Sequence, residues 1–231
     1  LLTAPVDLLW NGGSGTYVKS STETHADVGD KANDAVRVDG NELRATVVGE
    51  GGNLGMTQLG REEFALHGGS SYTEFIDNAG GVDCSDHEVN ITILLNELLA
   101  AGDMTGKQRD QLLHEMTDAV AELVLYDNYK QTQALSQAQY RSRERAGEYV
   151  QLIAALESEG LLDRKLEFLP CDDALAERAA LGKGLPRPEL SVLISYSKIE
   201  LKEALLKSRV PDDDYLAREM ESAFPQLLGE R

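Results

Sequence analysis

The sequence predicts an α/β fold in residues 1–104, built on part of a parallel sheet, followed by an α-helical region over residues 105–231. Two observations lead to this prediction. Residues 1–104 hold 15 of the 21 glycines, and apolar runs in this part enter glycine-rich loops three times. The later residues are poor in glycine and carry apolar side chains at helical spacing. Strand, glycine loop and helix in repeated order are typical of an α/β sheet.

Three apolar runs, at residues 6–10, 45–48 and 75–77, are predicted to be strands that end in glycine loops. Continuous apolar runs of this length are typical of buried parallel strands. In open α/β sheets, ligands bind at the carboxyl ends of the strands, where glycine allows the backbone to approach closely. The three loops could therefore form one side of a nucleotide crevice. The alternative, that the glycines only permit tight turns, stays open.

Other segments of the first part have helix-forming or turn-forming composition. Residues 22–35 and 57–67 are predicted to be helical. Residues 36–38 and 43–45 flank Asp39-Gly40-Asn41, which predicts a β-hairpin.

Three apolar stripes at helical spacing follow in the second part. They comprise Ile91, Leu94, Leu95, Leu98 and Leu99; Leu113, Met116, Val120, Leu123 and Val124; and Leu190, Leu193, Ile194, Leu201 and Leu205. The third begins after Pro186-Arg187-Pro188, and proline suits the first turn of a helix. Residues 160–186 are predicted to connect helices. An ordinary helical core explains the stripes, although an assembly surface would also do so.

Charge and composition exclude several classes of function. With 22 basic and 40 acidic residues the net charge is −18, and such a surface repels nucleic acid and anionic lipid. We therefore expect no nucleic-acid and no membrane partner. Two cysteines indicate a reducing compartment, and we expect the cytoplasm. Because the sequence starts with Leu1 and enters a strand almost at once, we expect it to be a piece of a longer protein.

The usual fingerprints of phosphate loops and nucleophile elbows are missing from the sequence. Cys84 and His87 have the spacing of two zinc ligands, but no second pair stands at finger spacing, so we expect no metal site. Ser85 and Glu88 fit a capping box, which predicts that a helix starts here. The free N–H groups of such a start could let Ser85 bind a carboxylate.

Three segments resemble the glutamate dehydrogenases. Glu50-Gly51-Gly52-Asn53-Leu54-Gly55 is similar to their E-G-A-N-G-P segment, and residues 78–85 are similar to A-N-A-G-G-V-x-x-S. Residues 6–13 resemble the V-D-I-L-I-P-A-A strand that precedes both. The likeness is closest to the large-subunit bacterial NAD-specific enzymes, whose pattern matches GEGGNLGMTQLGR, DNAGGVDCSDHEVNI, RPELSVLISYSK and PDDDYLAREM.

This resemblance implies a fold, a cofactor and site residues. Residues 1–104 would be the C-terminal half of a Rossmann-type NAD-binding domain. Gly12 and Gly13 would lie beside the ribose and nicotinamide of NAD, Asn53 would contact the nicotinamide ribose, and Asn78 would lie where nicotinamide and substrate meet. Ser85 would bind the distal carboxylate of L-glutamate. The parent protein, expected to be a homo-oligomer, would convert L-glutamate to 2-oxoglutarate and ammonia.

Departures from the family pattern concern the substrate pocket. Leu54-Gly55-Met56 follows Asn53 in place of the usual glycine and proline, and Asp86 and His87 replace aromatic residues. The catalytic lysine and aspartate of such enzymes match nothing here, so we expect no catalytic residue in this chain and no turnover by the chain alone. Two alternatives stay open: an amino-acid dehydrogenase of other specificity, and a helical assembly or regulatory module.

Overall fold

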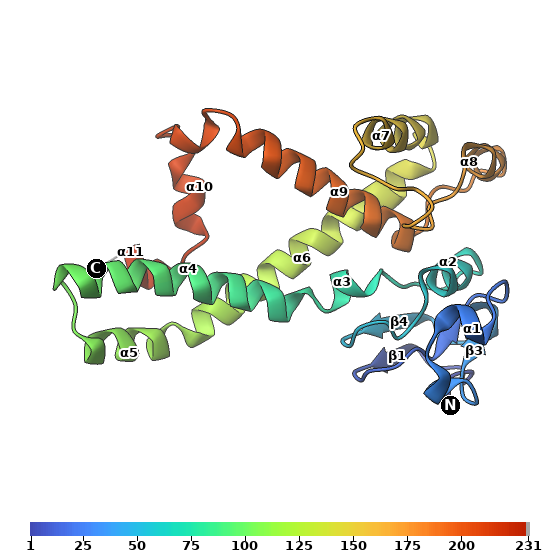
Figure 1. The fold of residues 1–231 in the computed structure, drawn as a ribbon, viewed down its shortest axis with the longest axis horizontal. Helices are drawn as coiled ribbons and strands as arrows, with labels where there is room; N and C mark the ends of the chain where they lie inside the picture. The colour runs from blue at the N-terminus through green and yellow to red at the C-terminus, as the bar shows by residue number, and fades with distance from the viewer. Residues whose placement is uncertain (230–231) are drawn as a thin grey trace. The chain divides into compact units, whose positions relative to one another are not determined.

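The computed structural model describes residues 1–229 and divides the chain into two compact units (Figure 1). The first unit contains Leu1–Asn78 and Thr132–Glu200, and the second contains Ala79–Gln131 and the residues from Leu201 onward. The predicted sequence boundary at residue 104 stays a prediction.

Two pairs of short parallel strands form the β-structure of the first unit. Strand β1 (Leu8–Asn11) pairs with β4 (Val47–Glu50), with Leu8 opposite Val47. Strand β2 (Val18–Lys19) pairs with β3 (Val38–Asp39). The prediction of short parallel strands combined with helices is therefore confirmed, although most of the described residues are helical.

The predicted hairpin around residues 39–41 is wrong. Residues Gly40–Glu42 form the 3-10 turn η2, which Asp39 caps, while β3 pairs in parallel with β2. Helix α2 (Gln58–Leu66) lies so close that a Cβ at Gly40 would stand 2.5 Å from the carbonyl oxygen of Gly60. Glycine is therefore needed at position 40 for helix packing, not for a two-residue hairpin turn.

The third predicted strand is also wrong. Residues Glu74–Asp77 form the single-turn helix α3, preceded by Thr73 in the extended backbone conformation of an N-cap. Glu74 and Asp77 lie in the first turn, where acidic side chains complement the helix dipole. Only Ile76 of this turn is buried.

The two predicted helices of the first part have different outcomes. Residues 22–35 form only α1 (His25–Val28) and the 3-10 turn η1 (Lys31–Asn33), because Gly29 interrupts them with a φ of 74°. Helix α2 is confirmed. Its N-cap Thr57 accepts a hydrogen bond from the Gly60 N–H at 3.0 Å.

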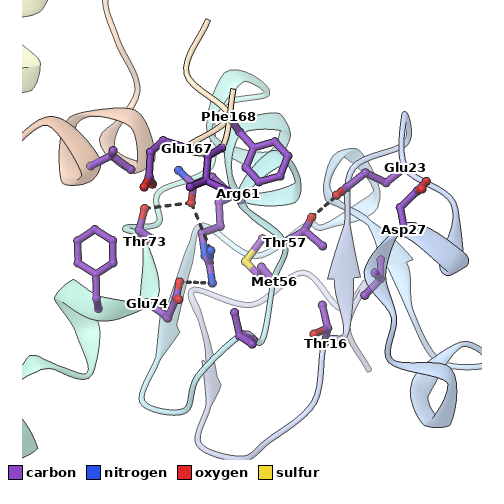
Figure 2. A pocket seen from close by; sticks show the side chains of 16 residues that line it. Thr16, Glu23, Asp27, Met56, Thr57, Arg61, Thr73, Glu74, Glu167 and Phe168 are labelled. Atoms are coloured by element: carbon purple, nitrogen blue, oxygen red, sulfur yellow. Dashed lines mark hydrogen bonds and ion pairs between the residues drawn. The ribbon is translucent and has the colours of Figure 1, made fainter. Parts of the chain in front are cut away.

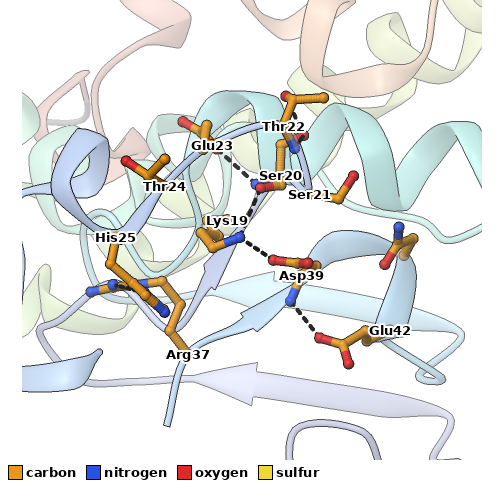
Figure 3. A network of polar contacts seen from close by, with 12 residues as sticks. Lys19, Ser20, Ser21, Thr22, Glu23, Thr24, His25, Arg37, Asp39 and Glu42 are labelled. Atoms are coloured by element: carbon orange, nitrogen blue, oxygen red, sulfur yellow. Dashed lines mark hydrogen bonds and ion pairs between the residues drawn. The ribbon is translucent and has the colours of Figure 1, made fainter. Parts of the chain in front are cut away.

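Polar contacts bind the loops around β2 and β3 (Figure 3). The Lys19 ammonium pairs with Asp39 across the two strands. Arg37, whose side chain is fully buried, donates to the Thr16 carbonyl oxygen at 2.8 Å and to Asp34 at 2.6 Å. These contacts fix the segment that follows β1.

Helices complete the first unit and supply its larger core. They are α7 (Ala146–Ser158), α8 (Asp172–Ala180) and parts of α6 (Thr117–Ser142) and α9 (Arg187–Leu206). The core contains Leu135, Ile153, Leu156, Leu175, Leu190 and Leu193, together with Ile76 of α3. The predicted third stripe begins a helix as expected, whereas the predicted connector 160–186 contains α8.

The second unit is helical. It contains α4 (Ala79–Ala101), α5 (Gly106–Glu115), the start of α6, η3 (Val210–Asp212), α10 (Ala217–Ser222) and α11 (Gln226–Gly229). Ile91, Leu95, Leu112 and Met116 form its buried core. The second stripe is not one helix, because α5 ends before Met116 and α6 begins after it. In residues 1–229 we find no helix long and apolar enough to cross a membrane.

Candidate functional site

The loops that follow β1 and β4 meet the end of α3 inside the first unit. Gly52 packs so closely against the carbonyl group of Gly13 that a side chain at position 52 would overlap it. The Asn78 amide donates a hydrogen bond to the Asn53 side-chain oxygen. The geometry therefore places the predicted cofactor-binding residues Gly13, Asn53 and Asn78 around two close contacts, with Gly12 adjoining them in sequence.

A second link holds the end of α3 against β4. The Glu50 N–H donates to Asp77 Oδ2 at 2.9 Å. Burial raises the pKa of Asp77 from its ordinary 3.8 to about 6, with the Glu50 carboxylate adding to the rise against this hydrogen bond. The link positions Asn78, the next residue in the chain, beside Asn53.

Side-chain packing explains several glycines of this region. A Cβ at Gly49 would stand 2.7 Å from the Trp10 ring, and a Cβ at Gly51 would stand 2.5 Å from it. A Cβ at Gly55 would overlap the Asn11 amide. Close packing of Trp10 and Asn11 therefore accounts for these three glycines, a reason that neither interpretation from the sequence gave.

A hollow of about 300 Å³ adjoins the loop after β1. It is lined by Leu2, Leu9, Trp10, Asn11, Gly13, Tyr17, Val18, Val48, Gly55 and Met56, none of which carries a charged side chain. The Asn11 amide nitrogen is enclosed here and makes no hydrogen bond. A buried donor without a partner is costly, and this nitrogen packs against Gly55.

A second hollow, of about 400 Å³, adjoins the loop 54–57 (Figure 2). Four carboxylates line it, those of Glu23, Asp27, Glu74 and Glu167, against the single guanidinium of Arg61. Arg61 is already paired with Glu74 at 2.5 Å. This hollow therefore repels phosphates and dicarboxylates, and it is a poor site for either NAD or glutamate.

A buried ion pair beneath the loop was not predicted from the sequence. Glu50 Oε2 accepts from Arg61 Nε at 2.6 Å, and Glu50 Oε1 accepts from Arg61 Nη2 at 2.9 Å and from the Met56 N–H at 3.0 Å. Both side chains are almost completely buried. The sequence pattern that could have predicted this ion pair is a glutamate at the end of an apolar strand, followed by an arginine inside an amphipathic helix.

The backbone of Leu54 has a φ of 58°, in the left-handed region that favours glycine. Its side chain is 60% exposed. In the E-G-A-N-G-P segment that residues 50–55 resemble, glycine occupies the position of Leu54. The backbone here therefore has a conformation that suits glycine, although the residue is leucine. Such strain is found preferentially at functional loops.

Ser85, the predicted substrate-binding residue, lies exposed on α4 in the second unit. Helix α4 begins at Ala79, six residues earlier, so the predicted capping box at Ser85 and Glu88 is wrong. The Ser85 N–H lies within the helix, and only the hydroxyl of this residue is offered to a ligand. The sequence did not predict that α4 begins at Ala79, because Gly80 and Gly81 were interpreted as part of a loop.

We expect Gly52→Ala to lower the free energy of unfolding by about 1–3 kcal/mol, because the new methyl group meets backbone that must move. Gly13→Ala is the matched control, since nothing lies within 4 Å of a Cβ there. Urea denaturation of both variants measures the difference. Equal stability of the two variants would contradict the close contact between the loops.

The chain matches two family models. Residues 1–138 match "Bacterial NAD-glutamate dehydrogenase, catalytic domain", and residues 182–231 match "Glutamate dehydrogenase, C-terminal". Three relatives are each named NAD-specific glutamate dehydrogenase. They are 74% identical in Pseudomonas aeruginosa, 60% in Halomonas elongata and 48% in Mycobacterium tuberculosis, each over the whole chain.

The chain spans 14% of the length of each of these relatives. The first family model covers more than half of the chain, including all of the loops that meet around Asn53. The chain therefore belongs to the bacterial NAD-glutamate dehydrogenase family.

Proposed function

We propose that this chain supplies the nicotinamide side of the NAD site in an enzyme that oxidatively deaminates L-glutamate to 2-oxoglutarate and ammonia. The observation that carries the proposal is the meeting of three chain segments, through the Gly13–Gly52 approach and the Asn53–Asn78 hydrogen bond. The short parallel strands that lead to these loops fit the second half of a Rossmann-type domain.

The residues of the site have distinct roles in this proposal. Gly12 and Gly13 let the backbone approach the ribose and nicotinamide, and Asn53 contacts the ribose. Asn78, held by Asn53 and by the Asp77 link, lies where cofactor and substrate meet. Bound NAD would supply the hydride acceptor, while the protein orients the substrate beside it.

We assign the catalytic residues to other parts of the parent protein. The lysine that polarises the substrate and the aspartate that transfers a proton have no counterpart in this chain. We therefore propose a cytoplasmic, homo-oligomeric parent enzyme, and no turnover by these 231 residues alone.

The direct test is NADH formation by the longer protein that contains this chain, supplied with NAD and L-glutamate. Glutamate-dependent NADH formation supports the proposal. Reaction with leucine or phenylalanine in place of glutamate would favour the alternative of an amino-acid dehydrogenase with other specificity. Absence of NADH with every amino acid would reject a dehydrogenase.

Ser85→Ala in that longer protein is expected to raise the KM for glutamate about 10- to 100-fold. A hydrogen bond from a hydroxyl group to a carboxylate contributes about 1.5–3 kcal/mol, and tenfold corresponds to about 1.4 kcal/mol. Steady-state kinetics at saturating NAD measures the change. Ser136→Ala, which removes an exposed serine hydroxyl from α6, is the control and should leave KM unchanged. An unchanged KM in Ser85→Ala would remove Ser85 from the substrate site.

A further inference from the structure

One histidine and two aspartates come together within the second unit. Asp83 and His87 lie one turn apart on α4, and Asp127 lies on α6. His87 Nε2 is 3.4 Å from Asp127 Oδ2 and 4.0 Å from Asp83 Oδ1. One possible ligand atom from each residue lies within 4.8 Å of the other two.

The histidine of this cluster is enclosed. Its side chain is 12% exposed, and its Nε2 atom is buried without a hydrogen bond. The two helices approach each other closely nearby, because a Cβ at Gly80 would touch Val124 and Asn128 at 3.7 Å. His87 Nε2 is therefore held between two helices and faces carboxylates on both.

The spacing distinguishes this cluster from a hydrogen-bonded histidine. Hydrogen bonds from ring nitrogen to carboxylate oxygen have lengths of about 2.7–3.2 Å, shorter than both distances here. Ligand atoms at about 2.1 Å from a tetrahedral metal ion are themselves about 3.4 Å apart. The separation of His87 Nε2 from Asp127 Oδ2 matches this edge, and Asp83 Oδ1 lies 4.0 Å from the same nitrogen.

We propose that Asp83, His87 and Asp127 bind a divalent transition-metal ion of the zinc type. One imidazole nitrogen and two carboxylate oxygens are a ligand set that Zn²⁺ and Co²⁺ accept. Three protein ligands leave a coordination position for water. Because the ligands come from two helices, the bound ion would cross-link α4 to α6 and stabilise the folded chain.

This site is separate from the proposed substrate contact. Asp83 and His87 share one face of α4, whereas Ser85 is two residues from each and so points to a different side of the helix. It also differs from the pair considered from the sequence, because Cys84 is exposed and not part of the cluster. The competing explanation is that His87 and the two aspartates interact only with one another and bind no metal.

The test is a Zn²⁺ titration of the full chain after dialysis against a chelator, followed by calorimetry and by thermal melting. We expect one Zn²⁺ per chain and a higher Tm in its presence. His87→Ala and Asp127→Asn should each weaken binding at least about tenfold. Co²⁺ should give visible absorption bands in the wild type that both variants lose. Circular dichroism checks folding, and Asp127→Asn, at an exposed position, tests the site if His87→Ala fails to fold.

Two control variants separate this site from other metal binding. Cys84→Ser tests the neighbouring thiol, and His114→Ala tests an exposed histidine on α5. Both should bind Zn²⁺ as the wild type does. Absence of a one-to-one site in the wild type, equal binding by Asp127→Asn, or loss of binding in Cys84→Ser would each overturn the proposal.

Discussion

Replacing Arg61 with alanine is expected to lower the free energy of unfolding by about 3–5 kcal/mol, because it leaves a buried carboxylate without its partner. Glu50 is 0% exposed and receives two of its hydrogen bonds from the Arg61 guanidinium. The same guanidinium pairs with Glu74 at 2.5 Å. Urea denaturation measures the loss.

Arg145→Ala is the control for this prediction. Its side chain is 57% exposed and its Nη1 lies 3.4 Å from Glu148 Oε2, and such surface pairs contribute about 0–1 kcal/mol. Adding Glu50→Gln to Arg61→Ala should recover part of the stability, since the unpaired charge is removed. If Arg61→Ala proves no more harmful than Arg145→Ala, the buried pair does not hold β4 to α2.

The contrast between β4 and α3 explains how far the sequence could predict this fold. The apolar run at residues 45–48 leads into Glu50 and a glycine loop. It forms the parallel strand β4, as predicted. Residues 75–77 look equally apolar, but three residues do not distinguish a strand from one helical turn. The side chain of Thr73 donates to the Pro188 carbonyl oxygen at 3.0 Å, so this turn is set partly by a contact 115 residues away.

The prediction of the candidate functional site has the same limit, because local sequence does not reveal contacts between distant segments. The resemblance predicts cofactor-binding roles for Gly12, Gly13, Asn53 and Asn78, and the structure brings their segments together, while the roles stay predictions. Asp77 was missed because its role depends on the backbone of Glu50, which no local pattern reveals. Asp127 was missed because its position opposite His87 depends on how α4 and α6 pack.

The pH dependence of stability is expected to depend on a pair of buried carboxyl groups in the first unit. Glu62 of α2 and Glu189 of α9 are both buried, and the Arg178 guanidinium pairs with Glu189 at 2.5 Å. Burial, together with the charge of Glu189, raises the pKa of Glu62 from 4.5 to about 9. Burial also raises the pKa of Glu189, against the effect of Arg178. One guanidinium does not neutralise two buried carboxylates, so Glu62 keeps a proton at neutral pH.

A raised pKa in the folded state means that the folded chain binds this proton more tightly than the unfolded chain does. The contribution to stability is complete below pH 4.5 and is lost as the pH rises toward 9. Asp77, with its pKa of about 6, adds a loss of the same sign between pH 3.8 and 6. We therefore expect the free energy of unfolding to fall between pH 6 and 9, a range in which the Glu62 contribution dominates over that of Asp77.

Glu62→Gln isolates this contribution, because the amide resembles the protonated carboxyl group but does not ionise. The variant should match the wild type below about pH 4.5, and its advantage in free energy of unfolding should grow by about 2–4 kcal/mol between pH 6 and 9, since one pKa unit corresponds to about 1.4 kcal/mol. Urea denaturation at several pH values measures the difference. Glu177→Gln, at an exposed position of α8, removes the same charge and corrects for the general repulsion within a chain of net charge −18. Parallel pH curves for Glu62→Gln and Glu177→Gln would show that Glu62 is already ionised at neutral pH, and the expectation that burial keeps a proton on it would then be wrong.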